Sequence, residues 1–168
     1  MKDIKAYNLI FPIWVLLFFP PVIFITLVGN FLIDSIVIIA CFYFLKVTKI
    51  EFRLKNFYKK NILRVWVFGF IADIIGAVFL FMITISETFG LSYELASAIA
   101  YDPFSEPCAV LIICVAMLIS TICIFVFNYL YTFKNTIEDK KLRVKLALTI
   151  AILTIPWTFL LPTKWFFE

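Results

Sequence analysis

The sequence predicts an all-α membrane protein, folded as a compact bundle of about five transmembrane helices. Of its 168 residues, 64% are hydrophobic and only 15% are charged, whereas soluble domains average roughly 45–50% apolar and about 25% charged residues. Several apolar runs are long enough to cross a bilayer, and the basic residues gather between particular runs. These three observations predict a single integral membrane domain over residues 1–168.

The apolar runs divide the chain into the expected spans. A spanning helix needs about 20 mostly apolar residues. The first run, from Asn8 to Leu45, is long enough for two spans, and the turn pair Gly29-Asn30 divides it. We therefore expect spans at about 8–27, 30–46, 62–85, 107–133 and 144–162.

The first expected span contains three prolines, Pro12 and the pair Pro20-Pro21. Proline removes a backbone donor and clashes with the preceding helical turn. We therefore expect the first helix to be kinked or broken at Pro20-Pro21. A re-entrant hairpin is the alternative interpretation of this span.

The basic residues predict how the bundle is oriented. With five spans, all of the 15 basic residues except Lys164 fall on one side of the membrane. The connection between the third and fourth spans has no basic residue and carries acidic ones instead: Glu87, Glu94, Asp102 and Glu106. Because Lys and Arg favour the cytoplasmic side, we expect a cytoplasmic N-terminus and an external C-terminus.

This topology also accounts for the formal charge of +4, so we expect a lipid bilayer and no nucleic acid as the partner. Lys outnumbers Arg, and Ile and Phe are abundant, a usage that resembles proteins of AT-rich bacteria. We therefore expect the cell membrane of a bacterium, its inner membrane. Because five short helices enclose little volume, we also expect a homo-oligomer or a larger membrane complex.

The external connection contains a stretch typical of a short amphipathic helix. Residues 91–101 include no Pro or Gly, and Leu91, Leu95, Ala98 and Ile99 recur at helical spacing. We expect this helix to lie on the outer membrane surface. An ordinary ordered loop is the alternative.

Asp73 is the first candidate functional residue, because an ionisable side chain in hydrocarbon is costly. It lies near the centre of the third span, and its helical neighbours are small: Gly69, Ala72, Gly76 and Ala77. Small residues let another helix approach closely. We therefore expect Asp73 to point into the protein.

Asp34 is the second candidate, on one stripe of the second span with Asn30. Its expected depth differs from that of Asp73 by only about 5 Å, so the two carboxylates could share one site. Thr121 and Asn128 lie on a stripe of the fourth span and are also candidates, with Thr84, Thr154 and Thr158 as weaker ones. Ser and Thr often hydrogen-bond to their own helix instead.

No Lys or Arg lies in a span at comparable depth, so the sequence shows no ion pair for Asp73. Two close carboxylates would need a shared proton, a cation, water or backbone donors. The alternative is a protonated aspartate that hydrogen-bonds across a helix interface to hold the fold. The chain has no histidine and no C-x-x-C pair, so we expect no metal site and no cofactor.

These features favour a transporter or channel-type protein that uses the carboxylates to move a proton, a monovalent cation or a small solute. The alternative is a non-catalytic subunit or interaction protein of a larger membrane complex. An intramembrane enzyme is the third hypothesis, and we do not favour it. Two aspartates can activate water, but the local sequences LIDS and IADI lack the G-x-G-D pattern of membrane aspartyl proteases.

Overall fold

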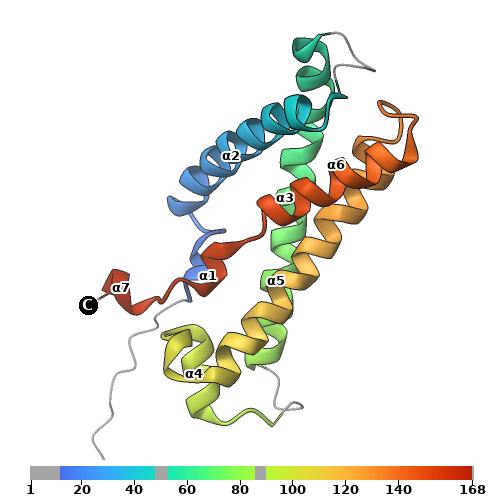
Figure 1. Cartoon of the computed structure of the whole chain (residues 1–168). Helices are drawn as coiled ribbons and strands as arrows, with labels where there is room; N and C mark the ends of the chain where they lie inside the picture. Colours follow the sequence, from blue (N-terminus) through green and yellow to red (C-terminus); the bar gives the residue numbers. More distant parts are fainter. Residues whose placement is uncertain (1–11, 48–52, 86–89, 168) are drawn as a thin grey trace, which may run out of the picture.

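A computed structural model of the chain describes residues 12–47, 53–85 and 90–167 (Figure 1). The described residues form helices and no strand. The helices are α1 (Ile13–Leu16), α2 (Val22–Phe44), α3 (Leu54–Ile85), α4 (Tyr93–Ala100), α5 (Pro107–Phe127), α6 (Lys140–Leu153) and α7 (Lys164–Phe167). A π-helical turn, Asn128–Thr132, extends α5, and a 3-10 turn, Trp157–Leu160, follows α6.

Four of the described helical segments are long and apolar enough to cross a membrane. They are Val22–Phe44, Leu54–Ile85, Pro107–Thr132 and Lys140–Leu160. Their length and composition fit a helical membrane bundle, the expected fold class.

The turn expected at Gly29-Asn30 is wrong, because both residues lie inside α2. An added Cβ at Gly29 would meet nothing within 4 Å, and glycine is common in transmembrane helices. The helix boundary falls instead between Leu16 and Val22, where Pro20 and Pro21 lie. The described residues therefore contain one helix of spanning length before the first basic connection, where we expected two.

Two other boundaries also differ from the expected spans. The third helix begins at Leu54 rather than near 62, because Lys, Leu and Arg are good helix formers whether or not they lie in lipid. The last helix ends at Leu153 rather than near 162. Pro156 lacks the N–H that a continuing helix requires and disfavours helical backbone in the residue before it.

The close contact between α3 and α5 is the centre of the fold (Figure 1). Ser120 of α5 donates a hydrogen bond of 3.0 Å to the carbonyl oxygen of Ala72 in α3. One turn further along α3, Gly76 lies against Ser120 and the backbone of Ala116. The small residues of α3 therefore allow the approach that the sequence predicts, and α5 is the helix that uses it.

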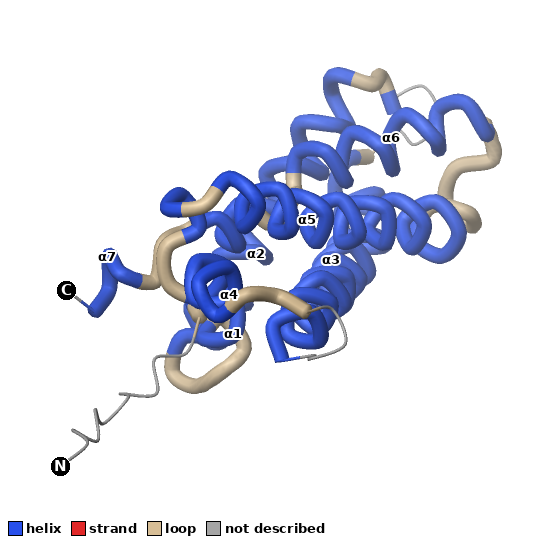
Figure 2. The backbone as a smooth tube through the Cα atoms, turned by 90° about the horizontal axis from the view of Figure 1, so that it is seen from below, coloured by secondary structure: helices blue, strands red, loops and turns tan. Residues whose placement is uncertain are grey.

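The other long helices are arranged around this pair. α6 contacts α5, and α2 contacts α3 and α6. Figure 2 shows the bundle from below, with α4 seen nearly end-on in front of the long helices. Buried apolar side chains form one cluster toward the basic connections and a second cluster around α4. Asp73 lies between Ala72 of the first cluster and Ala77 of the second.

The helix predicted within 91–101 is confirmed as α4. Ser92 caps it, since its hydroxyl accepts a hydrogen bond of 3.2 Å from the backbone N–H of Leu95. Ala98 and Ile99 are buried, whereas Tyr93 and Glu94 are exposed. The helix is therefore amphipathic, and its place on the outer membrane surface stays a prediction.

Hydrogen bonds tie α1, α4 and the C-terminal segment together at this end of the bundle. The backbone N–H of Ile13 donates to the Thr163 hydroxyl at 2.9 Å, and that hydroxyl donates to the carbonyl oxygen of Ala100 at 2.8 Å. Lys164 forms an ion pair with Asp102. Ile13 at the start of α1, Ala100 at the end of α4 and Thr163 therefore lie close together, in the part of the bundle toward α4 (Figure 1).

Candidate functional site

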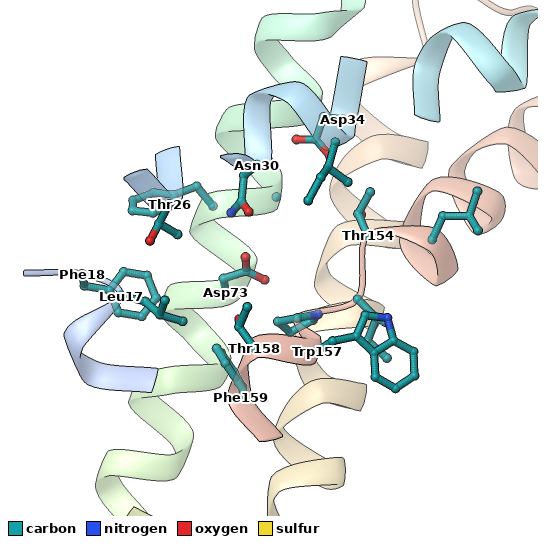
Figure 3. Close-up of a pocket in the computed structure, with 16 residues that line it drawn as sticks. Leu17, Phe18, Thr26, Asn30, Asp34, Asp73, Thr154, Trp157, Thr158 and Phe159 are labelled. Carbon is teal, nitrogen blue, oxygen red and sulfur yellow. The ribbon is translucent and has the colours of Figure 1, made fainter. Parts of the chain in front are cut away.

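A cavity of about 160 Å³ lies between α2, α3, the turn after α6 and the segment that joins α1 to α2 (Figure 3). Its volume is well above the ~10–15 Å³ that admits one water molecule. The lining is mostly apolar, with a small polar set: Thr26, Asn30, Asp34, Asp73, Thr154 and Thr158. Both predicted aspartates and Asn30 therefore meet at one place.

Asp34 reaches the cavity from the inner face of α2 and is only 5% exposed. Its carboxylate lies against Gly69 of α3, where an added Cβ would be 3.7 Å from Asp34 Oδ2. Asp73 follows Gly69 by four residues, which is about one helical turn. The Asp34 carboxylate therefore lies against α3 about one turn from Asp73. Asp34 accepts no hydrogen bond from any residue that the structure describes.

Asp73 is half-buried on α3, and its carboxylate points between α2 and the turn after α6 (Figure 3). Its Oδ1 atom is fully buried and accepts no hydrogen bond within the described part of the chain. Most buried polar atoms do have a partner, so an exception requires an explanation. Asp73 therefore has unused hydrogen-bonding capacity beside the cavity.

Two helix ends line the remaining walls. The chain leaves α6 at Thr154, and after Pro156 the side chain of Thr158 lies beside Asp73, whereas the indole of Trp157 points outward at the edge of the cavity and is 63% exposed (Figure 3). Leu17 and Phe18, which follow α1, close the opposite side. The cavity is thus bounded by two places where helices are interrupted.

The threonine hydroxyls remain able to accept hydrogen bonds. Thr26 donates to the Val22 carbonyl at 3.1 Å and Thr154 donates to the Ile150 carbonyl at 2.9 Å. Each donation uses the hydroxyl proton and leaves the oxygen lone pairs free. Apart from the donors on Asn30 and Thr158, the polar groups of the cavity are therefore acceptors, which suit a ligand with positive charge or donor protons.

Thr121 and Asn128, which we also expected at the site, do not line this cavity. Thr121 donates to the Met117 carbonyl at 2.7 Å, and Asn128 donates to the Ile124 carbonyl at 2.9 Å, both within their own helical segment. The reason is the tight contact of α5 with Ala72 and Gly76, which leaves no space between α3 and α5 beside Asp73.

Sequence reasoning missed Thr26 and Trp157. Thr26, Asn30 and Asp34 recur every four residues, a spacing that places them on one face of α2. We did not predict this shared face, because the turn expected at Gly29-Asn30 would place Thr26 and Asp34 on different helices. Trp157 follows Pro156, where the helix has already ended. We predicted a continuous helix through this point and therefore did not expect Trp157 at the cavity.

The charges at the cavity are of one sign. No Lys or Arg is among the described residues that line it. Within the described part of the chain, no group of three or more His, Cys, Asp and Glu residues could hold a metal ion. The site is thus a pair of carboxylates with an amide, hydroxyls and aromatic rings.

The chain matches no protein-family model, no curated protein and no solved structure. Its function therefore has to be inferred from the cavity and its chemistry.

Proposed function

We propose that this protein is a small transport protein of a bacterial cell membrane, which binds a cation between Asp34 and Asp73. The observation that carries the proposal is that carboxylates from two different helices line one cavity without a basic group. Two charges of like sign in a low-dielectric site are costly unless a cation or a proton offsets them. A site of this kind suits cargo that carries positive charge.

The unused acceptor on Asp73 supports binding over a purely structural role. An aspartate that only held the fold would hydrogen-bond to a group on a neighbouring helix. Asp73 Oδ1 has no such partner among the described residues. A buried polar group without a partner lowers the stability of the fold, and functional sites often contain such destabilising groups.

The interrupted helices support transport in particular. The cavity is bounded by the break before α2 and by the end of α6 at Thr154. Discontinuous helices commonly border the sites of secondary transporters, since their free backbone groups and flexible joints serve binding and exchange. The break at Pro20-Pro21 and the break at Pro156 would permit the cavity walls to move.

The alternative function is that of a non-catalytic subunit of a larger complex, and such a subunit needs a free surface for its partner. The small face of α3 is a surface that a helix of another protein could approach closely. Ala72 and Gly76 on that face contact α5 of the same chain. That face is therefore not available to a partner, although other lipid-facing surfaces are, such as that of α2 with Phe24, Ile25 and Ile36.

We also propose an orientation with both basic connections in the cytoplasm and α4 outside. Because Ile13, Ala100 and Thr163 meet at one end of the bundle, the start of α1 should lie outside as well. This differs from the cytoplasmic N-terminus that five spans would give, since one spanning helix precedes the first basic connection.

Reporter fusions test this orientation. Fusions at Met1 and at Glu168 should report the same, external side, and an insertion after Lys134 should report the cytoplasm. The insertion is the matched control, because it lies in a connection whose basic residues fix its side. Fusions that report opposite sides for the two ends would contradict the proposed orientation and restore the five-span topology.

Ion flux tests the proposed function. In proteoliposomes, the wild-type protein should carry sodium, potassium, methylammonium or protons faster than empty liposomes do. Asp73→Asn and Asp34→Asn should each lower that flux by more than about tenfold, because loss of one partner of a buried charge pair costs about 2–5 kcal/mol. Radiolabelled ions and a pH-sensitive dye measure the flux.

Two variants serve as controls for this assay. Thr121→Val alters a residue away from the cavity, and Glu138→Gln removes one negative charge from an exposed position. Both should retain wild-type flux. Wild-type flux equal to that of empty liposomes, or Asp73→Asn flux equal to wild type in a folded protein, would refute the transport proposal.

A further inference from the structure

A second, apolar groove lies beside the carboxylate cavity. It has a volume of about 740 Å³ and is lined by α1, the segment after it and α3 from Phe70 to Ile85. Its walls are almost wholly apolar and include Val78 and Phe81, which are 52% and 48% exposed. It reaches Ala100, so it extends from the level of Asp73 to the end of the bundle that carries α4. In a bilayer this groove would open to lipid chains.

The groove and the cavity are separated by an aromatic pair. Phe18 and Phe70 line both spaces. Their ring centroids are 5.5 Å apart, with an interplanar angle of 61°. A partition made of two side chains opens by rotation about side-chain bonds, without movement of a helix. Phe18 also belongs to the segment next to the Pro20-Pro21 break.

The chemistry of the cavity favours an organic head group over a metal ion. Ca²⁺ takes 6–8 oxygen ligands and Mg²⁺ requires near-ideal octahedral oxygen geometry. Here, carboxylates and a few other acceptors are set among Phe18, Phe70 and Phe159. Aromatic faces attract ammonium groups and help to replace their hydration. The mixed lining therefore matches an ammonium group better than a bare ion.

We propose that the cargo is a lipophilic amine, a cationic ammonium head group on an apolar chain, which reaches the cavity sideways from the membrane. The head group lies between Asp34 and Asp73, whose carboxylates Figure 3 shows, and the chain lies in the groove, past Phe18 and Phe70. This inference rests on the proposed function and names the class of cargo. A neutral lipid chain would fill the groove but leave the two carboxylates uncompensated.

Photolabelling of the full chain in nanodiscs tests the inference. The probe is decylamine with a diazirine near the end of its chain, and the matched neutral probe is the corresponding alcohol. Labelled residues are located by mass spectrometry. The amine should label groove residues such as Val15, Val78 and Phe81 several-fold more than lipid-facing residues such as Ile36 and Leu118, whereas the alcohol should label both sets alike.

The carboxylates should control this preference. Asp73→Asn should reduce amine labelling in the groove to the level of the alcohol, and Glu138→Gln should leave it unchanged. Excess unlabelled decylamine should compete in the wild-type protein. Amine labelling that is equal on all lipid-facing surfaces, or that persists in Asp73→Asn, would overturn the inference. If Asp73-dependent flux of small cations is found together with equal labelling, the proposed function stands and only the lipophilic cargo is refuted.

Discussion

Replacing Gly76 by alanine should destabilise the folded protein by about 1–3 kcal/mol, the usual cost of overpacking a close contact. An added Cβ would collide with Ser120 Oγ and would lie 3.1 Å from the carbonyl oxygen of Ala116 and 3.0 Å from Phe159 Cε2. The backbone oxygen cannot rotate away, and movement of Ser120 would break its hydrogen bond to Ala72. The temperature midpoint of unfolding should fall by about 2–12 °C, as that loss implies for a chain of this size.

Gly29→Ala is the matched control for this substitution. It lies in α2, where an added Cβ would meet nothing within 4 Å. Alanine in a helix interior gains roughly 0.5–1 kcal/mol over glycine. Unfolding of the purified variants, followed by tryptophan fluorescence during heating, compares the two. A Gly76→Ala midpoint equal to or above that of Gly29→Ala would show that α3 and α5 are not in close contact.

Asp73→Asn should have the opposite effect on stability, measured without added cation. The substitution removes a charge whose Oδ1 atom is buried and without a partner among the described residues. The amide oxygen of Asn stays unpaired, but the cost of burying a negative charge beside the second carboxylate is removed. The variant should therefore unfold at a temperature a few degrees above that of the wild type, while its cation flux is lost.

The same thermal measurement distinguishes a functional aspartate from a structural one. If Asp73 held the fold through a hydrogen bond, Asp73→Leu would leave the partner group unpaired and lower the midpoint. With no partner to lose, Asp73→Leu should not lower it. Glu138→Gln, which removes a charge from an exposed position, should change the midpoint little. A marked loss of stability in both Asp73 variants would contradict the proposed binding role.

Composition and periodicity are enough to predict the helical membrane fold. Hydrocarbon permits only helices or closed barrels, so apolar runs of sufficient length translate directly into helices. The same reasoning located Asp34 and Asp73, because ionisable residues stand out in such runs. The small face of α3 also predicted a close helix contact, since glycine and alanine leave room for one.

Breaks in helices were harder to place from the sequence. Gly29-Asn30 and Pro20-Pro21 both signal an interruption, and tertiary structure decides between them. Glycine keeps its N–H and therefore can continue a helix, as Gly29 does in α2, whereas proline cannot. The sequence also could not tell which helix α3 contacts. Hence Thr121 and Asn128 of the α5 segment were expected at a cavity that α2 and the turn after α6 line instead.

The most direct test of the shared carboxylate site is a double-mutant cycle on cation-dependent stability. A bound cation raises stability by about 2.7 kcal/mol at a concentration 100 times its dissociation constant. Unfolding midpoints of wild type, Asp34→Asn, Asp73→Asn and the double variant would be measured with and without sodium or decyltrimethylammonium. If both carboxylates hold one cation, each single substitution should remove most of the stabilisation, and the double variant should lose little more. A shared site between Asp34 and Asp73 would be contradicted if the losses of cation-dependent stabilisation in the two single variants added up in the double variant. It would also be contradicted if neither cation changed the unfolding midpoint of the wild type.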